Sequence, residues 1–276
     1  MKNKNGLSAY YLEISIKDLQ TSRILYENKF YAPAIFYIQQ SLEKLIKSNG
    51  YYLNIIAENN KINGKPVTHS TWKIYCQFWD NLKKSKYKRL LCLNQKRQKE
   101  MICASPVLIY IFEKYKKDND LRRINFNYLF NFLSQDDNRK KIKNLDFSDE
   151  IISKTIKKNF VLKDDISNLM DQINFEDNGA KQNSCSKSGS FIKIFWSITS
   201  TAVQLIGMLY YFSFFSIDIS IILFKYVDIA RYGNENILLL PSEILTKDHI
   251  LIKEYKEIYK IIQNMQKLFG YIEKSK

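Results

Sequence analysis

Glycine, proline and histidine are scarce in this chain. Only 8 Gly and 4 Pro occur in 276 residues, and tight β-hairpins depend on those residue types. A fold built from many short strands is therefore disfavoured. The 2 His and 4 Cys residues lack the CxxC spacing of a structural zinc site. We expect neither a metal nor another cofactor.

A secretion signal is also lacking, because Lys2 and Lys4 lead directly into a polar, amphipathic segment. Reduced thiols are then the default, and the sequence predicts a cytoplasmic protein. A hydrophobic content of 45% is enough to form a globular core. The net charge is +15, from 43 Lys and Arg against 28 Asp and Glu. Such a field attracts polyanions such as nucleic acid, although a solvated lysine-rich surface accounts for it equally well.

Hydrophobic periodicity predicts helices over residues 7–28, 31–57 and 247–273. Each has apolar residues at alternating spacings of four and three, the pattern of a helix that packs in a bundle or coiled coil. In the first helix the predicted core positions are Leu12, Ile16, Leu19, Arg23 and Tyr26. In the second they are Tyr31, Ile35, Ile38, Leu42 and Leu45, and in the third Leu251, Tyr255, Ile258, Ile262, Met265, Phe269 and Ile272.

The middle of the chain is predicted to hold shorter helices. A turn-rich loop at 58–66 precedes a third helix through Trp72 and Trp79, which Thr68 or Ser70 can cap. Further helices are expected around 101–112, 124–133 and 151–173, the last with Ser148 as its cap. Residues 174–190 are nearly free of apolar side chains and have the composition of a linker.

Two segments resemble the HEPN family, named for higher eukaryotes and prokaryotes nucleotide-binding. The first is Asp18-Leu19, then Tyr31 to Lys47 with Gln39-Gln40 and Glu43-Lys44, similar to the pattern Y-x-x-A-x-F-x-x-Q-Q-x-x-E-K-x-x-K. The second is Ala230-Arg231-Tyr232-Gly233, similar to the A-R-Y-P turn of the family with Gly in place of Pro. Thr68-His69 stands where members often carry a Thr-His pair.

The resemblance implies an all-α fold, an up-and-down helical bundle of four to five helices, usually dimeric. It implies a nucleotide or nucleic acid as ligand, a role in host defence or toxin–antitoxin pairing, and a nucleotidyltransferase as one possible partner protein. We assign 1–82 and 191–276 to the bundle, 83–173 to a basic helical insertion, and 174–190 to a linker. Helices with apolar seams at both ends of the chain need one another to bury those seams, which agrees with a split bundle.

Many HEPN relatives are metal-independent ribonucleases with an Arg followed, four to six residues later, by a His. Such chemistry needs an imidazole to move the 2′-hydroxyl proton and a guanidinium to hold the phosphate. Here Arg231 is followed by Asn236, which cannot act as a base, and neither His69 nor His249 follows an arginine at that spacing. We therefore expect binding without catalysis, and a ribonuclease with a non-standard active site is the alternative.

The nucleotide- or RNA-binding candidates are one polar stripe on the second helix and the residues around the Ala-Arg-Tyr turn. The stripe either meets a phosphate or forms a hydrogen-bonded bundle interior, in which Glu43 is expected to pair with Arg231. His69 either takes part in chemistry or only begins a helix. The full set is Gln40, Glu43, Lys44, Lys47, His69, Arg231, Tyr232 and Asn236.

Residues 83–123 carry 13 Lys and Arg against 4 acidic residues, with aromatic side chains between them. This composition suits a nucleic-acid strand, the alternative being a solvated face. The densest part of this basic run is Lys83, Lys84, Lys86, Lys88 and Arg89. Residues 194–217 hold no charge over 24 positions. We favour buried helices there over the alternative of a membrane anchor, because serine, threonine and glutamine interrupt the stretch.

Overall fold

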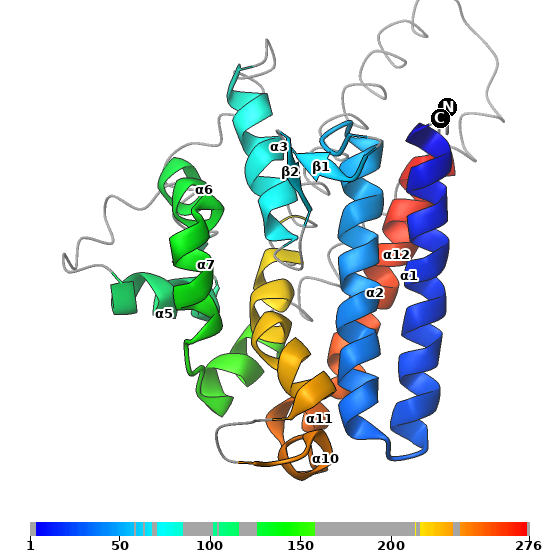
Figure 1. Cartoon of the computed structure of the whole chain (residues 1–276), viewed down its shortest axis with the longest axis vertical. Coiled ribbons are helices and arrows are strands. Elements are labelled where there is room, and N and C mark those ends of the chain that lie inside the picture. The colour runs from blue at the N-terminus through cyan, green and yellow to red at the C-terminus, as the bar shows by residue number, and fades with distance from the viewer. Residues whose placement is uncertain are drawn as a thin grey trace, which may run out of the picture.

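The computed structural model describes residues 4–57, 59–62, 64–67, 71–84, 102–103, 105–115, 126–157, 213, 216–233 and 238–274. Helices dominate these ranges, so the predicted all-α fold is confirmed. Figure 1 shows three layers of helices, with the two chain ends side by side at one end of the molecule.

The first layer is built on a long helical hairpin. Helix α1 (Lys4–Glu27) and α2 (Tyr31–Tyr52) run antiparallel and are joined by a short turn. Lys29 takes a positive φ of 64° in that turn, a left-handed conformation that ends helices. Of the predicted core positions of α2, Ile35, Ile38, Leu42 and Leu45 are buried, whereas Tyr31 is half-buried.

The seam of α1 differs from the prediction. Ile16 and Arg23 are exposed, and their places are taken by the buried serines Ser8, Ser15 and Ser22. These serines repeat every seven residues, as does the other buried set on α1, which includes Leu12 and Leu19. A small side chain whose hydroxyl bonds to the facing helix lets two backbones approach closely. The hydrophobic pattern alone does not show such a seam.

Helix α12 (Tyr255–Lys274) completes the first layer by packing on both α1 and α2. The predicted burial of Ile258, Ile262 and Met265 is confirmed, and so is the packing of the first helices on the last. The predicted helix over 247–273 is interrupted, however. A separate turn, α11 (Ile250–Lys253), comes first, and Glu254 breaks the helical path before α12 begins.

The second helix is shorter than predicted. It ends at Tyr52 instead of near residue 57, because the chain turns through Asn54 with φ 57° and the amide N–H groups of Ile55 and Ile56 bond back to the Gly50 carbonyl. A two-stranded antiparallel hairpin follows within the predicted loop, formed by β1 (Lys61–Ile62) and β2 (Lys65–Pro66). Gly64 takes φ 80° between them.

The second layer consists of α3 (Trp72–Lys84) and the helical residues 216–232 (Figure 1). Trp72 is fully buried and its ring meets Phe224 edge to face, with 5.0 Å between centroids. Tyr75 on α3 bonds to Ser216, with 3.2 Å between the oxygens. The two helices are therefore joined by both apolar and polar contacts.

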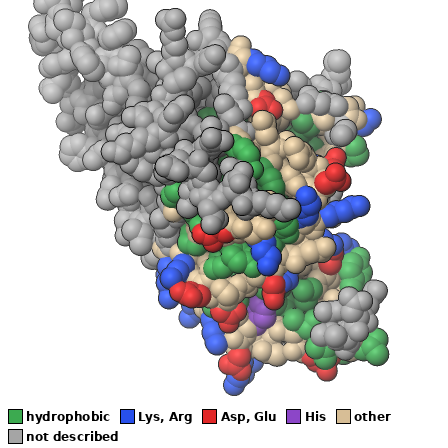
Figure 2. Space-filling model, turned by 90° about the vertical axis from the view of Figure 1, so that its left-hand side faces the viewer, with side chains coloured by type: hydrophobic (Ala, Val, Ile, Leu, Met, Phe, Trp, Pro, Cys, Tyr) green, Lys and Arg blue, Asp and Glu red, His purple; other side chains and the backbone are tan. Residues whose placement is uncertain are grey.

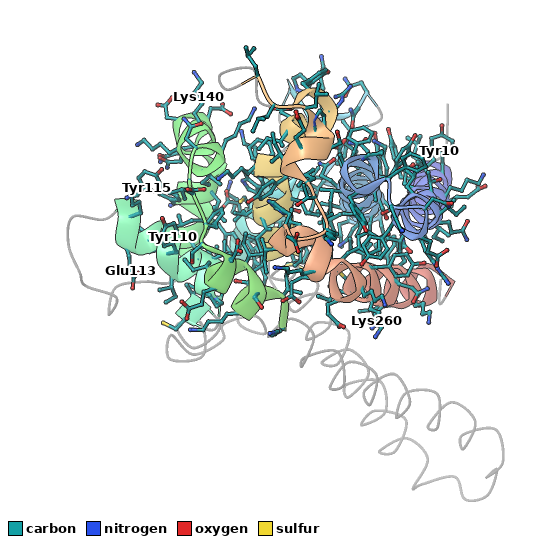
Figure 3. The ribbon with its side chains drawn as sticks, turned by 90° about the horizontal axis from the view of Figure 1, so that it is seen from below. Tyr10, Tyr110, Glu113, Tyr115, Lys140 and Lys260 are labelled. Carbon is teal, nitrogen blue, oxygen red and sulfur yellow. The ribbon has the colours of Figure 1, made fainter. Side chains whose placement is uncertain are left out.

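The third layer contains α5 (Pro106–Tyr115), α6 (Phe126–Ser134), α7 (Asp136–Lys143) and the helical residues 149–157. Ser148 caps the last of these, as predicted, by accepting a bond from the Ile151 N–H at 3.3 Å. Figure 3 shows Tyr110, Tyr115 and Lys140 at this side of the molecule, and Tyr10 and Lys260 on the bundle opposite.

One continuous hydrophobic core runs through all three layers. Ion pairs cross from the third layer to the second, joining Lys73 to Asp136, Lys225 to Asp146 and Lys143 to Asp228. Cationic and anionic side chains are accordingly mixed on the face in Figure 2. Within the ranges given above, no helix is both long and apolar enough to cross a membrane. Of the predicted apolar stretch 194–217, only Ser213, Ser216 and Ile217 are described.

Candidate functional site

The polar stripe of α2 forms a connected, largely buried cluster near α1. Glu43 lies at its centre, only 4% exposed. Its carboxylate accepts from Lys47 Nζ at 2.9 Å and lies 3.5 Å from Lys44 Nζ. Gln40 donates to the Gln39 side chain at 2.7 Å and accepts from Lys44 at 3.2 Å. The stripe is thus hydrogen-bonded within itself along two turns of helix.

Asp18 on α1 belongs to the same cluster. Burial raises the pKa of its carboxyl, the neighbouring Glu43 raises it further, and Lys44 opposes the rise. Among the described residues, two carboxylates therefore face two ammonium groups, and these four charges balance. A buried, balanced set of this kind is typical of a tie inside a bundle. Whether Gln40, Glu43, Lys44 or Lys47 also meets a ligand remains a prediction.

Arg231 occupies a different place from the one expected. It lies on the last turn of helix 216–232, exposed, with its guanidinium carbon 5.3 Å from the ring centroid of Phe36 and 5.1 Å from that of Tyr232. The expected pair with Glu43 is therefore wrong. Phe36 stands two turns before Glu43 on α2, roughly 10 Å along the helix axis. Glu43 is paired with Lys47 instead.

The two aromatic rings hold the guanidinium at the surface. Cations within about 6 Å of a ring centroid are attracted to its π face. Among the described residues no carboxylate pairs with Arg231. Tyr232 is itself 61% exposed. An unpaired cation beside an open aromatic ring can bind an anion and a planar group together.

Gly233 explains why the family proline is missing from this turn. Its φ is +74°, whereas proline is fixed near −65°. Its amide donates to the Ile229 carbonyl at 2.9 Å and ends the helix. A Cβ at this position would lie 2.1 Å from the Leu239 carbonyl oxygen. The backbone of Leu239 therefore lies directly against the Arg231–Tyr232 turn.

His249 has a structural role at the start of α11, and it does not lie on the face of the helix that carries Arg231. Its Nδ1 accepts the Leu251 N–H at 3.2 Å and so caps α11, and its ring meets Tyr226 edge to face at 5.1 Å. Tyr226 precedes Arg231 by five positions, about 140° around the helix, on a different face. Burial holds the pKa of His249 below its usual value.

Several predicted site residues fall outside the described ranges. These are His69, Asn236, Lys86, Lys88 and Arg89, together with the side chain of Lys83 and the capping candidates Thr68 and Ser70. Of the basic run, Lys84 is described and exposed. The proposed linker 174–190 also lies outside.

Two parts of this site are not among the predicted site residues. Phe36 is the Phe of the pattern Y-x-x-A-x-F, but the pattern does not indicate that it contacts Arg231. Leu238, Leu239 and Leu240 are a run of three exposed leucines beside the turn. A run of apolar residues ordinarily indicates core, so only a structure shows that these face solvent.

Comparison with known proteins supports the family resemblance for the helical hairpin. The family model of the HEPN domain matches residues 8–58, which comprise nearly all of α1, the turn and all of α2. No curated protein and no solved structure matches the chain. The matched segment contains the serine seam, the polar cluster and Phe36.

Proposed function

From this HEPN-domain hairpin we propose that the chain is a non-catalytic protein that binds a nucleotide or nucleic acid through Arg231. The observation that carries the proposal is the exposed guanidinium held between Phe36 and Tyr232, with no carboxylate neighbour among the described residues. Phe36 belongs to the matched segment and Arg231 to the turn that resembles the family. Two distant parts of the chain therefore meet at one site.

The chemistry of the site suits a phosphate. A guanidinium offers parallel N–H donors that fit two phosphate oxygens, and it stays charged at any physiological pH. A base or sugar next to that phosphate can contact the exposed Tyr232 ring, since every base offers a π face for stacking. The net charge of +15 draws a polyanion toward the protein from a distance.

Binding without hydrolysis is favoured because neither of two candidate positions supplies a free base. Cleavage of RNA without a metal needs a base near the 2′-hydroxyl. His249 is engaged in capping α11, and Asn236, at the matching spacing after Arg231, has no basic side chain. The proposed role is therefore capture of the ligand, as an accessory in host defence or in toxin–antitoxin pairing.

Two features of assembly belong to the proposal. The protein acts as a homodimer, as HEPN bundles usually do, with a partner protein such as a nucleotidyltransferase in its functional complex. Sedimentation velocity of the full chain tests the first feature. A single species at the mass of one 32.8 kDa chain over the micromolar range would refute it.

Nucleic-acid binding is tested in two steps. The absorbance ratio at 260 and 280 nm of the purified protein first reports any nucleic acid that it carries. Fluorescence anisotropy with a labelled 12-nucleotide RNA then compares the wild type with Arg231→Gln. We expect the variant to bind about 10-fold more weakly, the usual effect of losing one charged hydrogen-bonding group.

Arg23→Gln is the matched control, because Arg23 is also an exposed arginine but is already paired with Glu27 at 2.7 Å. Its affinity for the RNA should change less than twofold. Equal losses in the two variants would mean that the RNA responds only to net charge, and no binding by the wild type would refute the proposed function.

A further inference from the structure

Leu238 combines two unusual properties. It is 88% exposed, and its backbone has a φ of +54°. A bulky residue in the left-handed region is an outlier whose backbone conformation is energetically unfavourable. Strained residues of this kind cluster at functional positions. Burial of the side chain cannot offset the strain, because within the described structure almost nothing covers it.

The backbone around Leu238 is fixed on its C-terminal side. The Leu239 carbonyl lies against Gly233, and the Leu240 N–H donates to the Glu243 carboxylate at 2.6 Å at the start of α10 (Pro241–Ile244). Leu240 is 63% exposed. Leu238 and Leu240 are thus two exposed apolar side chains close together on a backbone with defined contacts, and we call this pair the leucine tip.

The leucine tip adjoins the cation of the candidate site. Leu239 touches Gly233, and Gly233 directly follows Tyr232, whose ring stands 5.1 Å from the Arg231 guanidinium. A ligand with a phosphate on Arg231 must therefore pass close to Tyr232 and the leucines. Along the chain the order is cation, aromatic ring, aliphatic tip.

We propose that the leucine tip contacts the bases of a single-stranded nucleic acid whose phosphate is bound by Arg231. This inference rests on the proposed function and narrows its ligand to an unpaired strand of at least two nucleotides. One base faces Tyr232, and the next lies against Leu238 and Leu240. Both leucines are exposed, and covering them with base faces removes apolar surface from water.

The charge and shape of the surface favour this occupant. The Arg231 guanidinium, which has no carboxylate partner among the described residues, complements a phosphate chain. Exposed leucine side chains can meet the faces of unstacked bases, whereas a duplex hides those faces in its stack and must be partly unstacked before a leucine can enter. A mononucleotide offers one base and cannot reach both Tyr232 and the tip.

The test uses the full chain with Leu238→Asn and Leu240→Ser combined. Asparagine tolerates a positive φ, so the turn keeps its conformation. Ile16→Ser is the control, because Ile16 is an aliphatic residue 38% exposed on α1. Helical circular dichroism should be the same in all three proteins, which shows that each is folded.

Anisotropy titrations are run with a 12-nucleotide single strand, the matching duplex and a labelled mononucleotide, each at several salt concentrations. The double variant should bind the single strand about 10-fold more weakly at every salt concentration, with an unchanged salt slope, because leucines carry no charge. Duplex and mononucleotide affinities should change less than twofold. Arg231→Gln, in contrast, should flatten the slope by about 0.7.

The outcomes separate the two proposals. Wild-type protein that binds none of the three ligands refutes the proposed function itself. Binding that persists equally in the double variant, or falls equally for duplex and single strand, overturns the leucine-tip inference alone. A drop in the sedimenting mass of the double variant would assign the tip to a contact between copies of the chain. Wild-type binding to anionic lipid vesicles that is lost in the double variant would assign the tip to a membrane. Either result overturns the inference.

Discussion

Ser15 on α1 and Ser41 on α2 exchange a reciprocal pair of hydrogen bonds. The Ser15 hydroxyl donates to the Ser41 carbonyl at 2.7 Å, and the Ser41 hydroxyl donates to the Ser15 carbonyl at 2.8 Å. Gln266 of α12 then donates to the two hydroxyl oxygens, at 2.8 and 3.1 Å. All three helices of the first layer are therefore joined at one buried point.

The same pairing repeats along the hairpin. Ser8 and Ser48 exchange equivalent bonds at 3.1 and 2.7 Å, one repeat toward the chain ends. One repeat the other way, Ser22 donates to the Ala34 carbonyl at 2.8 Å and meets the Tyr255 hydroxyl at 2.8 Å. Small residues seven positions apart on both helices thus set the spacing of α1 and α2.

Replacing Ser15 with leucine should destabilise the protein strongly. The larger side chain has no room between the backbones, and it leaves Gln266 with one acceptor fewer. Overpacking costs about 1–3 kcal/mol and a lost buried hydrogen bond about 1 kcal/mol, so a loss of about 2–4 kcal/mol is expected. Urea denaturation measures it. Gln20→Leu, which adds an apolar side chain on the exposed face of α1, should change stability by less than about 0.5 kcal/mol.

The serine seam also shows how far the sequence could be read. Burial of Ile35, Ile38 and Leu42 on α2 and of Ile258 and Ile262 on α12 follows from apolar periodicity, and that prediction is confirmed. On α1 the same spacing selected Ile16 and Arg23 and passed over the serines, which count as polar. The burial of a serine depends on a carbonyl partner in another helix, which for Ser15 is 26 residues away. A local pattern does not contain that information.

The candidate site divides in the same way. The Ala-Arg-Tyr motif predicts that Arg231 and Tyr232 are candidate binding residues. It does not indicate that the guanidinium of Arg231 contacts the ring of Phe36. Phe36 lies on another helix, nearly 200 positions earlier, and meets Arg231 only after the bundle is assembled. Likewise, the substitution of Gly for Pro at 233 was visible, but its reason is a positive φ and a close backbone contact.

Gly233→Ala should therefore lower the free energy of unfolding more than an ordinary glycine substitution does. The added Cβ would meet the Leu239 carbonyl oxygen at 2.1 Å and push the leucine segment away from the turn. Gly64→Ala is the control, because Gly64 has a similar φ of +80° with open space around its Cβ position. The control reports the cost of a positive φ alone, about 1 kcal/mol.

Chemical denaturation of both variants measures the difference between their free energies of unfolding. We expect Gly233→Ala to lose at least about 1 kcal/mol more than Gly64→Ala, since a backbone oxygen cannot swing away as a flexible side chain can. RNA affinity of Gly233→Ala should fall as well, because the turn carries Tyr232. Equal stability losses at the two glycines would contradict the close contact.

His249 should make the stability of the bundle depend on pH. Its Nδ1 caps α11 only while unprotonated, and burial holds its pKa in the folded protein below the usual 6.5. Asp149 opposes that shift and Lys225 adds to it. The unfolded chain therefore binds the proton more readily, so the contribution of His249 is complete above about pH 6.5 and is lost as the pH falls toward the folded pKa.

The variant His249→Asn isolates this effect. Asparagine supplies a capping oxygen that does not titrate, so the free energy of unfolding should depend less on pH between 7 and 5 than in the wild type. His249→Ala, which has no cap, should lose about 1 kcal/mol at pH 8. Urea midpoints at three pH values check both. A steeper pH dependence in His249→Asn would exclude His249 as the titrating group.

The basic run over residues 83–123 gives a last prediction. Residues 83–123 supply 13 of the 43 basic side chains, against 4 acidic ones. If this run follows the phosphates of a bound strand, each neutralised phosphate adds about −0.7 to the log–log salt slope of the binding constant. Changing five of the basic residues to Gln should then flatten the slope by up to about 3. The five are Lys83, Lys84, Lys86, Lys88 and Arg89.

The control removes the same charge from a different surface. Lys17, Lys253, Lys256, Lys260 and Lys267, all exposed on α1, α11 and α12, change to Gln together. Filter binding of one RNA from low to moderate salt compares the two variants with the wild type. A smaller change in slope for the control places the strand along the basic run. Equal changes would show that only net charge attracts the RNA, and Arg231 would then remain the sole specific phosphate contact of the proposed function.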